Sequence, residues 1–162
     1  MKPIQVGDIV PSFSLPDQDG KMINITDYIG RKKLVIFFYP RDGSHFCTKE
    51  ACYFRDLSQT FDEVNAVIFG ISGQSIENHK KFASQYRLDY PILSDEGNEV
   101  RKLFGVPANA FGLIDGRVTY VANQEGKIVH IFNSQLHPER HVDEALKVCL
   151  LLKRTDNEKI AV

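Results

Sequence analysis

The chain has 162 residues, of which 43% are hydrophobic and 25% charged, with a formal net charge of −1. A chain of this size can bury a full core, so we expect one domain over residues 1–162 in which three cysteines need not form a disulfide framework. The near-neutral charge gives no reason to expect a nucleic-acid partner. No stretch approaches the roughly 20 apolar residues of a membrane-spanning helix or resembles a signal peptide, so the expected location is cytoplasmic. An organelle reached through a presequence outside this sequence is the alternative.

The first half of the chain alternates between extended and helical patterns. Residues 34–39 are apolar at every position and too few for a stable helix, which predicts a central strand covered on both faces. From Thr48 to Phe61 apolar residues recur at spacings of three and four, the period of a helix. Residues 66–72 predict a second buried strand, and residues 75–86 an amphipathic helix.

The second half completes an α/β pattern. Residues 90–93 predict a short strand, residues 98–104 a helix, and residues 118–132 a hairpin. Pro138 opens a last helix, predicted to end near Lys153, with a short polar C-terminal tail from about residue 154. This order predicts an α/β fold with a central mixed β-sheet flanked by helices, and it fits the thioredoxin-like architecture.

Two cysteines, Cys47 and Cys52, follow the central strand at its junction with a helix. The first N–H groups of a helix are unpaired and carry partial positive charge, so they stabilise a thiolate. A free cysteine is only about 3% thiolate at neutral pH, and this placement therefore favours a reactive sulfur. Inert core cysteines are common, but the strand–loop–helix context favours a redox-active cysteine with its own resolving partner.

The segment FYPRDGSHFCTKEAC, residues 38–52, resembles the active-site signature of the peroxiredoxins. The resemblance is to the peroxiredoxin Q (bacterioferritin comigratory protein) group, whose pattern is close to FYPxDxTPGCTxEAC. Similarity continues in residues 10–15, 79–83, 91–95 and 117–121, so it covers nearly the whole chain. The resemblance implies a thioredoxin-like fold and a thiol-dependent peroxidase.

The resemblance also implies roles for individual residues. Cys47 matches the peroxidatic cysteine, which attacks peroxide and becomes a sulfenic acid, and Cys52 matches the resolving cysteine. Arg117 matches the arginine that stabilises the thiolate and the transition state. Glu50 matches a glutamate that orients this arginine. Without the resemblance, Arg117 would be interpreted as a surface cation of a strand.

Three further residues complete the predicted pocket. Pro40 matches the proline that shields the sulfur from water, and Ser44 stands where the family has threonine or, less often, serine to bind the peroxide. His45 and Phe46 replace the usual Pro-Gly before the cysteine. His45 either faces the sulfur and couples to its titration, or points to solvent while Phe46 walls the pocket.

The implied activity is reduction of hydrogen peroxide and organic hydroperoxides in antioxidant defence and cell redox homeostasis. Thioredoxin or a similar dithiol would recycle the enzyme, which is expected to act as a monomer without metal or other cofactor, nucleic acid or membrane. A thioredoxin-type disulfide reductase is an alternative, disfavoured because the spacing lacks the tight CxxC geometry. A non-enzymatic redox sensor is another.

The remaining cysteine and a histidine pair are assigned no chemistry. Cys149 lies among apolar residues of the last predicted helix, which indicates burial. His137 and His141 have the spacing of a helical metal pair, but without acidic or thiol ligands nearby we interpret them as a solvated helix start.

Overall fold

The structure, a computed structural model, describes residues 2–109 and 114–160. Its centre is a five-stranded sheet of order β5-β4-β3-β8-β9. Strands β3, β4 and β5 are mutually parallel, whereas β8 is antiparallel to β3 and β9 is antiparallel to β8. The strands are β3 (Lys33–Phe38), β4 (Ala66–Ser72), β5 (Ile92–Ser94), β8 (Val118–Ala122) and β9 (Ile128–Asn133). The predicted mixed sheet is present.

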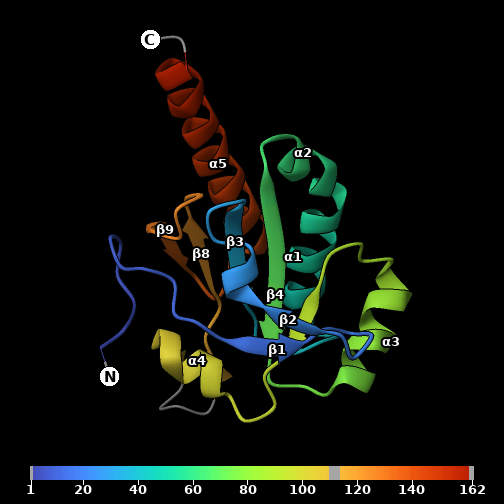
Figure 1. Cartoon of the computed structure of the whole chain (residues 1–162). Helices are drawn as coiled ribbons and strands as arrows, with labels where there is room; N and C mark the ends of the chain where they lie inside the picture. The colour runs from blue at the N-terminus through green and yellow to red at the C-terminus, as the bar shows by residue number, and fades with distance from the viewer. Residues whose placement is uncertain (1, 110–113, 161–162) are drawn as a thin grey trace.

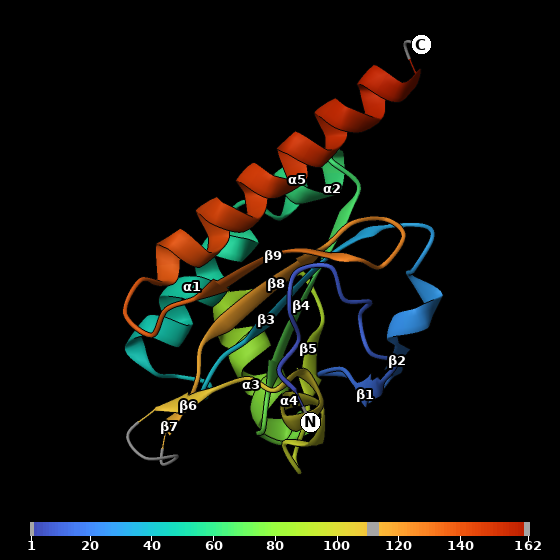
Figure 2. The ribbon, with the colours of Figure 1, turned by 90° about the vertical axis from the view of Figure 1, so that its left-hand side faces the viewer.

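Each face of the sheet carries its own layer (Figures 1 and 2). Four helices pack on one face and bury the first hydrophobic cluster: α1 (His45–Asp56), α2 (Ser58–Glu63), α3 (Ile76–Tyr86) and α5 (Pro138–Ile160). The other face is covered by the N-terminal segment and one helix: β1 (Ser14–Pro16), β2 (Met22–Asn24), η1 (Ile25–Asp27) and α4 (Glu99–Phe104). In Figure 2 helices α1 and α5 lie on the side of the sheet opposite β1 and β2.

Strand β3 is buried on both faces, as its unbroken apolar run predicts. Val35 and Phe37 belong to the cluster under α1 and α5, whereas Leu34 and Ile36 belong to the opposite cluster. All four side chains are 0% exposed. The chain leaves the carboxyl end of this strand, makes a short loop and enters α1, the position at which open α/β sheets place their functional sites.

Several element boundaries differ from the sequence prediction. Helix α1 begins at His45, three residues before Thr48, because Ser44 caps it: the Ser44 side chain accepts a hydrogen bond from the Cys47 N–H. The expected helical run to Phe61 is interrupted at Leu57, which separates α1 from α2. A small hairpin of β6 (Ala108–Asn109) and β7 (Ile114–Asp115) was not predicted.

The last helix is also longer than predicted. It continues to Ile160, so residues 154–160 are its final turns rather than a separate tail, and these turns extend beyond the sheet (Figures 1 and 2). The apolar periodicity marks where α5 stops contacting the core, and not where the helix ends. Beyond that point Asp156 still pairs with Lys33, with 3.7 Å between Oδ2 and Nζ. Within the described chain, no helix has the length and apolar character needed to cross a membrane.

Candidate active site

Cys47 lies in the first turn of α1 and is 1% exposed. Gly43 precedes the helix with φ +81°, a left-handed turn that glycine adopts without steric cost. Ser44 is then extended, and its Oγ lies 3.3 Å from the Cys47 nitrogen, which donates to it. The local sequence Gly43-Ser44 therefore starts the helix at a point that puts the Cys47 sulfur in the field of the helix N-terminus.

Arg117, the residue immediately before β8, connects Cys47 to Glu50. Its Nη2 donates to Cys47 Sγ at 3.1 Å, and its Nη1 donates to Glu50 Oε1 at 2.9 Å. Arg117 is 3% exposed and Glu50 is 0% exposed. Glu50 lies three residues after Cys47, so both side chains leave α1 on the same side and meet one guanidinium.

The pKa of the Glu50 carboxyl lies well above its ordinary value. Burial raises the pKa of Glu50 to about 8, although the Arg117 guanidinium opposes this by favouring the carboxylate. Its second oxygen, Oε2, has no hydrogen-bond partner and lies 3.5 Å from Nδ1 of His141. His141 is 0% exposed, so the prediction that it is solvated was wrong, whereas His137 is exposed as expected.

A cavity of about 520 Å³ opens over the Cys47 site. Pro40, Ser44, Phe46 and Arg117 line one part of it, and Ile114, Gln135 and Leu136 are among the residues that line the rest. Two polar groups of this lining contact Cys47 directly: the Ser44 hydroxyl accepts from the Cys47 N–H, and the Arg117 guanidinium donates to the Cys47 sulfur. The cavity therefore combines two polar groups that contact the buried Cys47 with apolar side chains of Phe46, Ile114 and Leu136.

The two residues that depart from the family signature differ in exposure. His45 is exposed, and its ring packs against the Phe46 ring with 5.5 Å between centroids. Phe46 is half-buried. Both residues line the cavity, but the ring contact of His45 is with Phe46 and not with the Cys47 sulfur, which favours a solvent-facing His45 with Phe46 as a wall of the cavity.

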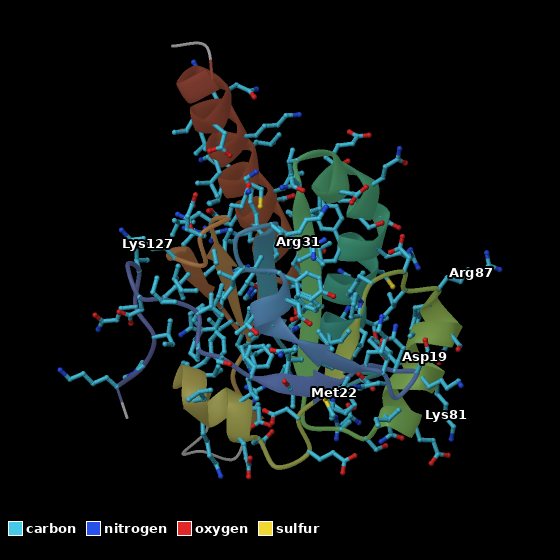
Figure 3. All side chains as sticks on the ribbon, in the orientation of Figure 1. Asp19, Met22, Arg31, Lys81, Arg87 and Lys127 are labelled. Carbon is cyan, nitrogen blue, oxygen red and sulfur yellow. The ribbon has the colours of Figure 1, made fainter. Side chains whose placement is uncertain are left out.

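Cys52 lies on a different side of α1 from Cys47. It is half-buried and contributes to a second cavity of about 430 Å³, next to Thr48 and Tyr86. Burial raises the pKa of Cys52, with Arg55 opposing; the Arg55 Nη1 lies 3.7 Å from its sulfur. Lys81 on α3 and Arg87, the residue after its end, project outward from the surface (Figure 3). Both cysteines are free thiols, so the structure corresponds to the reduced protein.

Arg101 supports the site, although no role was predicted for it from the sequence. It is 5% exposed, and it donates from Nη1 to the Gly116 carbonyl at 2.8 Å and from Nη2 to the Tyr39 carbonyl at 2.9 Å. These carbonyls immediately precede Arg117 and Pro40, so Arg101 braces both segments. The signal was available: an arginine within the buried stripe of α4, between Val100 and Phe104.

The loop before α1 is fixed by a second set of contacts. The Tyr39 hydroxyl donates to Asp42 Oδ1 at 2.6 Å, and the Asp42 backbone N–H donates to Gln74 Oε1. Burial raises the pKa of Asp42 to about 6, with the Tyr39 hydrogen bond opposing. These contacts tie residues 39–42 to the segment after β4 and so support the residues that face the cavity.

Cys149 is 0% exposed, as predicted. Burial raises its pKa to about 12, with Lys33 opposing, so the thiol stays neutral at physiological pH. In the described parts of the chain, no group of three or more His, Cys, Asp or Glu side chains is arranged to hold a metal ion.

The fold and the buried thiol–arginine pair define a thioredoxin-like thiol protein, and comparison with known proteins makes the class more specific. Residues 6–131 match the model of the AhpC/TSA family. Chloroplastic peroxiredoxin Q of Gentiana triflora is 47% identical over 144 residues, 89% of this chain and 66% of that protein's length. Chloroplastic peroxiredoxin Q of Sedum lineare is 46% identical over 147 residues, 91% of this chain and 78% of that protein.

Solved structures of similar proteins share the fold of this chain. The crystal structure of peroxidoxin BcpB from Mycobacterium tuberculosis superposes with a TM-score of 0.84 at 37% identity, covering 91% of this chain and 97% of that chain. The bacterioferritin comigratory protein of Xanthomonas campestris superposes with a TM-score of 0.79 at 26% identity, covering 87% and 92%. The chain belongs to the AhpC/TSA family and is a peroxiredoxin of the Q group, an oxidoreductase class that reduces peroxides with a thiol. The predicted family and thioredoxin-like fold are confirmed.

The expected cytoplasmic location is contradicted. The matching peroxiredoxin Q relatives from plants are named as chloroplastic proteins. Near-neutral charge and a compact α/β fold are common to proteins of plastids and of the cytosol, so composition did not carry this inference.

Proposed function

We propose that this chain reduces hydrogen peroxide and organic hydroperoxides through Cys47, with Cys52 as the resolving cysteine and thioredoxin or a similar dithiol as reductant. The observation that carries the proposal is the 3.1 Å contact between Arg117 Nη2 and Cys47 Sγ beside a cavity lined by Ser44. We further propose that residues 1–162 act as one domain and as a monomer.

The first step is attack of the Cys47 thiolate on one peroxide oxygen. The S–O bond forms as the O–O bond breaks, the sulfur becomes a sulfenic acid, and the leaving alkoxide or hydroxide takes a proton from solvent. Charge develops on the leaving oxygen, so donors that are already in place lower the barrier more than ionisation of the sulfur alone. Ser44 and Arg117 are proposed as these donors, while Pro40 keeps water from the sulfur.

The second step is attack of the Cys52 sulfur on the sulfenic acid, which forms an intramolecular disulfide and releases water. A dithiol then reduces the disulfide by two exchange reactions and is itself oxidised to a disulfide. The cycle thus consumes one peroxide and one dithiol and returns Cys47 to its thiol form. Thr48 and Tyr86 border the cavity at Cys52, where the reductant would first reach the sulfur pair.

The test of the proposed cycle is a coupled assay that follows a nicotinamide reductant in the presence of peroxide, thioredoxin and thioredoxin reductase. We expect many turnovers per enzyme molecule. A non-enzymatic sensor would consume one equivalent of peroxide and stop, and a disulfide reductase would reduce a protein disulfide without any peroxide. Turnover that persists in Cys52→Ser would show that the enzyme runs with one cysteine, and would contradict the resolving role of Cys52.

The apolar mouth of the cavity favours organic hydroperoxides. Phe46, Ile114 and Leu136 line it, and the latter two are 48% and 65% exposed. The Xanthomonas campestris relative is described as having alkyl peroxide reduction activity. An alkyl group that covers these side chains would add apolar burial that hydrogen peroxide cannot provide.

Phe46→Ala should change substrate preference. Loss of the ring removes apolar contact with a bulky organic hydroperoxide, so we expect the ratio of its kcat/KM to that of hydrogen peroxide to fall by about five- to tenfold. His45→Ala is the companion variant, for which we expect no shift of the pH–rate profile, because His45 is exposed. An unchanged ratio in Phe46→Ala would contradict the role of Phe46 as a wall of the substrate cavity.

Formation of the disulfide requires α1 to unwind. Residues five apart on an ideal helix have Cα atoms about 8.7 Å apart, whereas a disulfide usually needs less than about 7 Å. Both cysteines lie within the intact helix. Two contacts hold its later part: the Tyr90 hydroxyl donates to the Ala51 carbonyl at 2.7 Å, and Arg55 Nη1 donates to the Tyr86 carbonyl at 2.6 Å. Unwinding is therefore expected to be confined to the first turns.

Oxidation should raise amide hydrogen exchange from about Phe46 to Phe54. Unwinding of residues 47–50 frees their carbonyls, which normally accept from the amides of residues 51–54. Exchange mass spectrometry of the reduced and peroxide-oxidised protein measures this, with α5 as an internal reference. The oxidised Cys52→Ser variant is the control that cannot form the bond. A mapped Cys47–Cys52 disulfide with unchanged exchange over α1 would exclude the unwinding.

A further inference from the structure

One oxygen of a fully buried carboxyl group in the site faces a histidine that the proposed mechanism does not use. Glu50 Oε1 accepts from Arg117, whereas Oε2 is buried without a hydrogen bond and lies 3.5 Å from His141 Nδ1. An unpaired buried carboxyl oxygen is costly, so the contact calls for a proton between these two atoms. The contact joins α1 to α5.

The other contacts of His141 fix its tautomer. Its Nε2 lies 2.7 Å from the Ser134 carbonyl oxygen, which can only accept, so Nε2 carries a hydrogen. In the neutral ring Nδ1 is then the acceptor, 2.8 Å from the Thr119 hydroxyl. The Phe132 ring packs edge-on against the imidazole with 4.7 Å between centroids. The single Nδ1 lone pair therefore faces the Thr119 hydroxyl at 2.8 Å, with Glu50 Oε2 at 3.5 Å from the same nitrogen, so a second hydrogen on Oε2 would share this acceptor in a three-centre arrangement.

Charge balance favours neutral forms of Glu50 and His141. The Arg117 guanidinium contacts two acids, the Cys47 thiol and the Glu50 carboxyl, and one cation cannot compensate two buried anions. Burial raises the pKa of Glu50 to about 8, with Arg117 opposing. Burial is also the main cause that lowers the pKa of His141 to about 4. The other charged or titratable groups around the cluster include Arg101 on α4, Tyr90 before β5, Asp115 on β7, His137 just before α5 and Arg140 on α5.

We propose that Glu50 works as a neutral acid whose Oε2–H shares the Nδ1 lone pair of His141 with the Thr119 hydroxyl, which makes His141 a positioning residue for the thiolate. Glu50 then orients Arg117 through Oε1 without neutralising it, and the full guanidinium charge acts on the Cys47 thiolate. This inference rests on the proposed function of Cys47 and Arg117. It adds a residue, His141, and a protonation state to that site.

Infrared difference spectroscopy tests the protonation state without any activity. The reduced wild type at neutral pH should show a carboxylic-acid C=O band that is absent from Glu50→Gln. The band should move to higher frequency in His141→Phe, because the acid loses its hydrogen-bond acceptor. No difference between wild type and Glu50→Gln in this region would show that Glu50 is a carboxylate, and would overturn the proposal even if the peroxidase activity is confirmed.

Stability against pH gives a second test that needs only folded wild type and Glu50→Gln. A raised folded-state pKa means that the contribution of Glu50 is fully present below its ordinary pKa, near 4.3, and is lost as pH rises through about 8. The unfolding midpoint of the wild type should therefore fall relative to Glu50→Gln between these pH values. A constant difference between the two proteins over this range would contradict a neutral Glu50.

Kinetics test the link to the sulfur. We expect His141→Phe to lower kcat/KM for peroxide by about tenfold and to move the acid limb of its pH profile upward, because Arg117 is held less well. His137→Gln is the matched control, since His137 is exposed four residues earlier on the same segment, and it should retain wild-type kinetics. A folded His141→Phe with the wild-type profile would exclude the positioning role.

Discussion

Cys47→Ser is expected to abolish peroxidase turnover, leaving less than a few per cent of the wild-type rate. A serine hydroxyl neither ionises near neutral pH nor forms a sulfenic acid, so both the nucleophile and the oxidised intermediate are lost. The substitution exchanges one small side chain for another at a 1% exposed position, and the fold should survive it. The measurement is coupled turnover with peroxide and thioredoxin, together with the thermal unfolding midpoint.

Cys149→Ser is the matched control for this prediction. Cys149 is also buried, and burial keeps its thiol neutral by raising its pKa to about 12. The control should lose stability at most, because it places a hydroxyl among apolar side chains, and it should keep its turnover per folded molecule. Activity retained in Cys47→Ser, or lost in a folded Cys149→Ser, would reassign the nucleophile.

Arg117→Gln is expected to lower kcat/KM for peroxide by about 10²- to 10³-fold, the loss found when a preorganised donor to a developing negative charge is removed. Arg117 makes two separate contacts, one to Cys47 Sγ and one to Glu50 Oε1, and a glutamine amide cannot span both. The acid limb of the pH–rate profile should also move upward, because the thiolate loses its cation.

Arg117→Lys separates charge from geometry. A lysine keeps the positive charge but offers a single point of contact, so we expect a rate between those of the wild type and Arg117→Gln. Arg31→Gln is the control: Arg31 is exposed and lies just before β3, at the end of the strand remote from the loop that leads to Cys47 (Figure 3). Wild-type rates in both Arg117 variants would exclude this arginine from transition-state stabilisation.

The fold was predictable where a segment's own residues decide its structure. The apolar run of residues 34–39 predicts a strand buried on both faces, and β3 (Lys33–Phe38) is such a strand, one residue offset from the prediction. The ends of the helices were harder to predict from the sequence, because they depend on local contacts such as single capping hydrogen bonds. Capping by Ser44 starts α1 before its apolar period becomes visible, and α5 continues past its last core contact to Ile160.

Some residues of the candidate site were likewise predictable from the sequence, and others were not. The signature around Cys47 and the strand after Arg117 singled out residues that the structure brings around one cavity, and their catalytic roles stay predictions. Pairings across long stretches of chain were not accessible from one sequence. Nothing near His141 in the chain shows that it meets Glu50, and nothing near Arg101 shows that it meets the Tyr39 carbonyl. The first contact arises only when α1 and α5 pack together on one face of the sheet, and the second only when α4 packs against the carboxyl end of β3 from the other face.

The central claim is that peroxide oxidises Cys47 and that Cys52 resolves the product. Mass mapping of the reduced protein after one equivalent of hydroperoxide tests it most directly, with remaining thiols blocked before digestion. We expect one intramolecular Cys47–Cys52 disulfide and a blocked Cys149 thiol. A disulfide that contains Cys149, or a Cys47 thiol still free after the peroxide is consumed, would contradict the claim.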